Sequence, residues 1–133
     1  MRTFKQGAAL ALATMAALTG SLATSGPAMA ASSPIAACGG GSYHVIDQHS
    51  LGPSSTIYLL YNGSTNCVVT WRKRKDNTML TAKIRREGGI YVSDSGRFST
   101  YAGPVKISAQ GKCIQWGGND YIAAYTSPPE HCG

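Results

Sequence analysis

Four cysteines constrain the fold of this chain more than any other feature. They are Cys38, Cys67, Cys113 and Cys132. No two of them have the Cys-x-x-Cys spacing of a zinc site, which disfavours a metal-binding framework. In an exported chain of this size, an even number of cysteines is typical of disulfides, here two. Three pairings are possible and the sequence selects none of them, but we favour Cys38–Cys67 with Cys113–Cys132 because neighbouring hairpins are more easily tied than distant ends.

The N-terminal segment indicates export. A short basic stretch, Arg2 and Lys5, precedes an uncharged run rich in Ala and Leu over 7–22. Ala28-Met29-Ala30 then has small residues at the two positions that a signal peptidase reads. The apolar run is too short and too interrupted by Gly, Ser and Thr to span a membrane comfortably. We therefore predict a secretory signal peptide over 1–30 and a secreted mature protein without a membrane span.

One alternative processing route starts from residues 35–38. Their sequence, Ile-Ala-Ala-Cys, resembles a lipoprotein cleavage box, which would acylate Cys38. Such a box should follow the apolar run directly, and acylation would leave an odd number of cysteines in an oxidising compartment. We therefore prefer a flexible leader over 31–37, followed by a single disulfide-stapled β domain over 38–133.

After residue 38 the sequence is typical of an all-β protein. Runs rich in Val, Ile, Thr, Tyr and Trp alternate with Gly, Asn, Asp and Ser clusters, at the spacing of about 8–12 residues that is typical of a sandwich or barrel. No run has the apolar period of a helix. Strands are expected at 42–48, 56–61, 67–73, 78–86, 90–93, 98–101, 105–109, 113–116 and 121–125. We predict a small antiparallel β-sandwich or barrel of about eight short strands.

Three hairpins are predicted from local turn signals. The loop at 62–66 begins with Asn-Gly, where a positive φ costs little. A second hairpin is expected to turn at Asp76-Asn77 and a third near Asp94-Ser95-Gly96, so that consecutive strands pair antiparallel. Trp116 is interpreted as a core aromatic residue that enters a tight turn at Gly117-Gly118.

Positive charge is concentrated in the segment 67–87. Its net charge is +5, whereas that of 31–133 as a whole is +4. A turn at Asp76-Asn77 would place on one core face Val69, Trp71, Leu80, Ala82 and Ile84. The opposite, solvent-facing side would carry four cations: Arg72, Arg74, Lys83 and Arg85. Four like charges on one face repel one another unless an anionic partner is near.

Two interpretations of this cationic hairpin stay open. As a functional face, it would dock an anionic polymer such as a wall phosphate polymer, nucleic acid or a membrane surface. As a structural feature, it would be a solvated edge that lysine and arginine protect from aggregation. The overall charge of +4 is too small to indicate a nucleic-acid-binding protein by itself.

The sequence contains no convincing catalytic or metal-binding set. His44, Asp47 and His49 lie close together, but no nucleophile elbow or oxyanion loop flanks them. On a regular strand Asp47 and His49 would share a face with Tyr43, and His44 would point to the other side. His131, next to Cys132, is interpreted as terminal packing or as a solvent-facing neighbour of the disulfide. We predict that the protein is not an enzyme and has no small-molecule substrate, cofactor or metal ligands.

Several short motifs together resemble a known family. They are AACGGGSYHVID at 36–47, IYLLYN at 57–62, NCVVTW at 66–71, TYAGPV at 100–105, GKCIQWGG at 111–118 and the terminal HCG. In combination they look like the spore-associated protein A family, small exported proteins of filamentous, spore-forming actinobacteria. The resemblance implies an exported protein that is associated with spores or the developing aerial surface, and it carries no catalytic motif.

Two functional hypotheses follow. The leading one is a secreted, non-enzymatic protein associated with the spore or cell surface, which adheres to an anionic envelope polymer through the cationic hairpin. The alternative is a secreted inhibitor of an extracellular hydrolase, such as a protease or lysozyme, because small disulfide-rich β proteins often present rigid loops.

Overall fold

The computed structural model describes residues 31–133, and the signal peptide predicted over 1–30 lies outside the described residues. The described chain contains one short helix and eight strands: α1 (Pro34–Cys38), β3 (His44–Leu51), β4 (Ser55–Tyr61), β5 (Asn66–Arg72), β6 (Leu80–Arg86), β7 (Val92–Gly96), β8 (Tyr101–Ile107), β9 (Ile114–Asn119) and β10 (Ala124–Thr126). All pairings are antiparallel. The predicted all-β class is confirmed.

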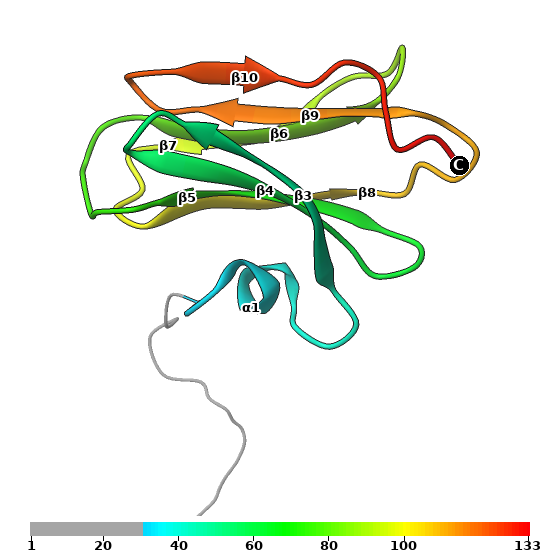
Figure 1. Cartoon of the computed structure of the whole chain (residues 1–133), viewed down its shortest axis with the longest axis horizontal. Helices are drawn as coiled ribbons and strands as arrows, with labels where there is room; N and C mark the ends of the chain where they lie inside the picture. The colour runs from blue at the N-terminus through cyan, green and yellow to red at the C-terminus, as the bar shows by residue number, and fades with distance from the viewer. Residues whose placement is uncertain (1–30) are drawn as a thin grey trace, which may run out of the picture. The chain divides into compact units, whose positions relative to one another are not determined.

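The strands form two four-stranded sheets (Figure 1), with the orders β3-β4-β5-β8 and β10-β9-β6-β7. Between them lies the larger hydrophobic cluster, which includes Ile57, Leu59, Val68 and Trp116. Within 31–133 no helix has the length and apolar character needed to cross a membrane.

The first predicted hairpin is confirmed, and the other two are wrong. β4 pairs with β5 across the Asn-Gly loop, with Leu59 opposite Val68. After β5, however, the chain crosses to the other sheet, where β6 pairs with β7 and β9. It crosses back after β7, so the predicted turn at 94–96 is part of a strand. The segments predicted as strands at 98–101 and 105–109 give instead the single strand β8, which pairs with β5.

A second, smaller cluster lies on the other side of the first sheet. Its buried members are Cys38, Leu60, Cys67 and Val69, and the half-buried aromatic rings around them are Tyr43, Tyr58, Trp71 and Tyr101. Figure 1 shows α1 against this face of the sheet, away from the second sheet. The predicted common core face of the cationic hairpin is therefore divided: Val69 and Trp71 pack with the helix side, whereas Leu80, Ala82 and Ile84 pack between the sheets.

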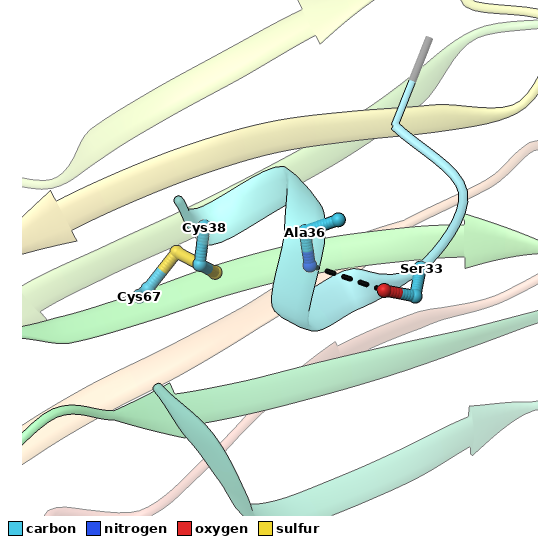
Figure 2. The surroundings of a disulfide bond; sticks show 4 residues. All are labelled: Ser33, Ala36, Cys38 and Cys67. Carbon is cyan, nitrogen blue, oxygen red and sulfur yellow. Dashed lines mark hydrogen bonds between the residues drawn. A yellow bond between two sulfur atoms is a disulfide. The ribbon is translucent and has the colours of Figure 1, made fainter. Parts of the chain in front are cut away.

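The helix α1 occupies most of the segment predicted as a flexible leader. Figure 2 shows its N-cap, where Ser33 Oγ accepts the N–H of Ala36 at 3.1 Å. Pro34 follows at the first helical position, and Gly39 ends the helix in a left-handed conformation with φ of 119°. The Ser-Pro start is a helix signal that the β-oriented interpretation overlooked. The local structure is therefore helical, and the disulfide of Cys38 anchors its end.

Both favoured disulfides are present. Cys38 bonds Cys67 (Figure 2), and Cys113 bonds Cys132. The first bridge is completely buried, whereas Cys113 is half-buried and Cys132 is exposed. The first bridge is therefore part of a hydrophobic core, whereas the second ties the C-terminal segment to the residue before β9.

The glycines after Trp116 do not form the predicted turn but continue strand β9. A Cβ atom at Gly117 would collide with the carbonyl oxygen of Tyr125, and one at Gly118 with Thr81 and Thr70. Glycine is needed here because neighbouring backbones approach closely. Trp116 itself is only 1% exposed, in agreement with its predicted core position.

Candidate functional site

The four cations predicted to form one face do not share a strand pair. Arg72 ends β5 and is only 5% exposed. Its Nε donates to the carbonyl of Phe98 at 2.9 Å, and its guanidinium also bonds the hydroxyl and carbonyl of Thr78. Asp76 lies 4.0 Å away. Arg72 therefore fixes the crossover between the sheets, and its assignment to a solvent face is wrong.

The remaining three predicted cations fall in two places. Arg74 is exposed in the crossover after β5, between the exposed Lys73 and Lys75. Lys83 and Arg85 alternate with the buried residues of β6 and are half-exposed on its outer side. The structure thus keeps Lys83 and Arg85 together and separates them in the fold from Arg74.

The outer side of β6 carries a small cation–aromatic cluster. Lys83 Nζ lies 4.8 Å from the centroid of the Tyr91 ring, and the Arg85 guanidinium carbon lies 4.7 Å from it. Arg85 also donates from Nε and Nη2 to Gln115 Oε1, at 2.9 and 2.7 Å. These contacts hold two positive charges in fixed positions on the surface.

A second group of polar residues meets where β3 faces the C-terminal segment. His131 Nε2 lies 2.9 Å from Asp47 Oδ2 and 3.7 Å from Glu130 Oε2. These three residues, Asp47, Glu130 and His131, are called the tail triad below. From the sequence alone, Asp47 is considered together with His44 and His49, and His131 is interpreted separately, as terminal packing; 84 residues separate Asp47 from His131.

The C-terminal segment is held firmly enough to place its two triad residues. Glu130 forms an isolated β-bridge with Ile114, with N–H···O distances of 2.8 and 3.0 Å in the two directions. The Cys113–Cys132 disulfide anchors Cys132, the residue that follows His131. Between these anchors, His131 takes a left-handed backbone with φ of 53° and is the only non-glycine residue of 31–133 with a positive φ. The pairing of the cysteines was the sequence signal that could have pointed to this place.

A β-bulge places Asp47 on the inner side of β3. Val45 pairs with Leu60 and Asp47 pairs with the next residue, Leu59, so Ile46 is the extra residue. Asp47 and His49 share a face, as predicted, but Tyr43 packs on the opposite side of the sheet with the disulfide of α1. The alternation breaks at the bulge, which the sequence does not reveal.

Aromatic rings surround the triad. His49 stacks on Tyr125 with ring centroids 3.5 Å apart, and Trp116 meets Tyr125 edge-on at 5.7 Å. Trp116 Nε1 donates to Glu130 Oε2 at 2.7 Å. Burial, and then the negative charges of Glu130 and Asp47, raise the pKa of Tyr125, so its hydroxyl stays protonated over the physiological range.

A hollow of about 420 Å³ opens beside the triad. Its lining includes His131, Ile46, Tyr61, Asn66 and Gln110. Among residues 31–133, no serine or threonine hydroxyl is hydrogen-bonded to a histidine ring. The arrangement can bind a cation or orient a polar group, and it brings a histidine–carboxylate pair to the edge of a hollow.

The fold and these surroundings define a class: a small two-sheet antiparallel β protein stapled by two disulfides. Such bridges form in oxidising compartments, which fits an extracellular location. Among known proteins, the chain is similar to Spore-associated protein A of Streptomyces coelicolor, with 42% identity over 85 residues. The match covers 61% of this chain and 54% of that protein, so the chain spans about half the length of this relative.

This similarity agrees with the family resemblance of the sequence motifs. No family model matches the chain. No solved structure matches it either.

Proposed function

We propose that this protein is a secreted, non-enzymatic component of the spore or cell surface that adheres to an anionic envelope polymer. The name of its relative supports the association with spores. The two disulfides support an extracellular location. The positive surface charge supports the anionic partner.

One observation carries the polymer-binding part of the proposal. Among residues 31–133, Arg72 is the only lysine or arginine whose side chain lies within 4.0 Å of a carboxylate oxygen. The other nine basic side chains of this part of the chain have no internal ion pair. Their charge is therefore available to an external anion.

The free cations gather in two short stretches. The crossover after β5 presents the exposed Lys73, Arg74 and Lys75 in succession, and the end of β6 presents Lys83, Arg85 and Arg86. Each contact with a polymer phosphate or carboxylate is weak in water. Salt also screens it, with a Debye length of about 8–10 Å at physiological ionic strength. A repeating polymer engages several such contacts at once, so that their effects multiply.

The test compares two double variants with the same change in charge. In the first, Arg74 and Lys75 are changed to Ser, and in the second, Lys106 and Lys112 are changed to Ser. Each protein is mixed with washed spores and with isolated wall polymer, and is then released with rising salt. We expect the wild type and the second variant to bind and to elute with salt, and the first variant to bind weakly.

Arg72 is left intact in these variants because its guanidinium holds the crossover. Release that does not depend on ionic strength would refute adhesion through charge. Equal weakening of both variants would show that net charge, rather than the crossover, decides binding. Tight, salt-resistant inhibition of an extracellular protease or lysozyme by the wild type would favour the inhibitor hypothesis instead.

A further inference from the structure

We propose that the tail triad, Asp47, Glu130 and His131, is a binding site for a divalent transition-metal ion of the Zn²⁺ type. This inference goes beyond the proposed function and does not depend on it. The site would be made by strand β3 and the C-terminal segment, and it includes none of the cations of the crossover.

The ligand atoms have the separations that such an ion requires. A tetrahedral zinc ion holds nitrogen and oxygen ligands at about 2.0–2.1 Å, which places ligand atoms about 3.3 Å from one another. His131 Nε2 lies 2.9 Å from Asp47 Oδ2 and 3.7 Å from Glu130 Oε2. One atom of each residue lies within 4.8 Å of the other two. Small rotations of the side chains therefore suffice to complete the site.

The charges around the triad also favour a cation. Two carboxylates converge on one imidazole, and no lysine or arginine among residues 31–133 lies within 4.0 Å of either. With no cation between them, the two neighbouring carboxylates repel each other. A bound divalent ion removes this repulsion.

Residues around the triad orient its side chains and fix its backbone. The Trp116 indole donates to the Glu130 oxygen that faces the histidine, which orients this carboxylate as outer partners do in known metal sites. The β-bridge of Glu130 and the disulfide of Cys132 fix the backbone on either side of His131. Asp47 stands on a strand of the first sheet. Little conformational freedom is lost on binding.

The donor set selects the kind of ion. One imidazole nitrogen and two carboxylate oxygens suit zinc and its neighbours, whereas calcium takes about six to eight oxygens. Three protein ligands leave a fourth position open to water or to an oxygen of a partner molecule. His131 also lines the hollow, and the three side chains are 38%, 29% and 31% exposed in chain order, so an ion can reach them. On binding, the imidazole Nε2 releases its proton to water.

The competing explanation is an ordinary ion pair between a protonated His131 and the two carboxylates. Zinc titration of the protein, expressed with its own N-terminal segment and purified with both disulfides intact, separates the two. Calorimetry measures the affinity, and NMR follows the imidazole resonances of each histidine. The variants are Asp47→Asn, Glu130→Gln and His131→Gln, with His44→Ala as the matched control on the same strand.

The first two variants keep an oxygen that accepts a hydrogen bond, from His131 in one case and from Trp116 in the other, so the fold is preserved. We expect the wild type and His44→Ala to bind one equivalent of Zn²⁺, with resonances of His131 shifting. Each triad variant should lose at least about tenfold in affinity. Zinc should also raise the unfolding temperature of the wild type and of His44→Ala only.

Either of two results would overturn the site. One is zinc uptake by the wild type that does not exceed that of Asp47→Asn. The other is an equal loss of affinity in His44→Ala. Circular dichroism of each variant without metal verifies that it is folded.

Discussion

The two disulfides make a natural comparison, because the same bond is used in opposite ways. Cys38 and Cys67 are both fully buried and form part of a core with Leu60 and Val69. Cys132 is exposed and ties the end of the chain. The first region, α1 with its cluster, stabilises the fold, and the second, the C-terminal segment, positions polar groups.

Chain entropy alone does not distinguish the two bridges. Their cysteines are 29 and 19 residues apart in the sequence. In the loop-closure model these spans correspond to about 3.5 and about 3 kcal/mol of stabilisation. Any larger difference on removal must come from the packing around the sulfur atoms.

The largest effect is expected from removing the buried bridge. Cys38→Ala with Cys67→Ala should lower the free energy of unfolding by about 5 kcal/mol or more, because loop entropy and buried packing are lost together. For a domain with a stability of about 5–15 kcal/mol, this loss can prevent folding. Denaturant unfolding measures it, and a loss no larger than that of the other bridge would contradict the comparison.

Removing the exposed bridge should cost less and act locally. Cys113→Ser with Cys132→Ser should lower the free energy of unfolding by about 3 kcal/mol or less, since little packing is lost. The near-ultraviolet circular dichroism of the core should be retained, while zinc affinity falls because His131 is released. Global unfolding of this variant would show that the C-terminal segment is part of the core.

A smaller effect is expected at the start of α1. Ser33→Ala removes the oxygen that caps Ala36 and should cost about 1 kcal/mol. Ser32→Ala, at the exposed neighbouring position, is the control and should change stability little. Zinc binding should be unchanged in both variants, because α1 and the tail triad lie in separate regions; a change would indicate coupling between them.

The smallest effect concerns acid. Burial raises the pKa of Asp120, but hydrogen bonds from Ser54 and from the backbones of Ala123 and Ile122 outweigh it, so the pKa is lower than usual. A lowered pKa stabilises the folded state above the unfolded value of about 3.9, and this contribution is lost as pH falls through the folded value.

The two regions should therefore differ in their response to acid. Asp120 precedes β10, on the path to the C-terminal segment, whereas residues 31–42 contain no acidic or basic side chain. Stability below about pH 4 should fall less steeply in Asp120→Asn than in the wild type. Unfolding curves at several pH values measure this, and an unchanged pH dependence in the variant would contradict the assignment.

Local patterns in the sequence predicted most of the strands, whereas the disulfide pairing was only favoured among three possibilities. Strand β4 and its hairpin partner β5 follow from β-branched residues on either side of an Asn-Gly loop. The pairing of β5 with β6 failed because a turn signal such as Asp76-Asn77 fits a crossover between sheets as well as a hairpin. Arg72 was placed on the solvent face for the same reason, whereas its side chain is buried.

The tail triad was beyond the reach of local patterns. Asp47 and His131 meet only because two sheets stack and the chain end folds back, and neither event leaves a periodic signal. The short helix α1 was missed for a different reason. Five residues are too few to show a helical period, so the Ser33-Pro34 start is the local sequence signal for this helix.

The bulge in β3 has a consequence for how this strand tolerates length changes. Removing a residue from a strand usually turns all that follows to the wrong face. Here Ile46 is the surplus residue, and Val45 and Asp47 already pair with adjacent residues of β4. A chain lacking Ile46 would keep Tyr43 with the helix and Asp47 with the histidine, and would lose the packing of Ile46 against the core and enlarge the hollow. Natural or engineered shortening of β3 is therefore most easily accommodated at this one position.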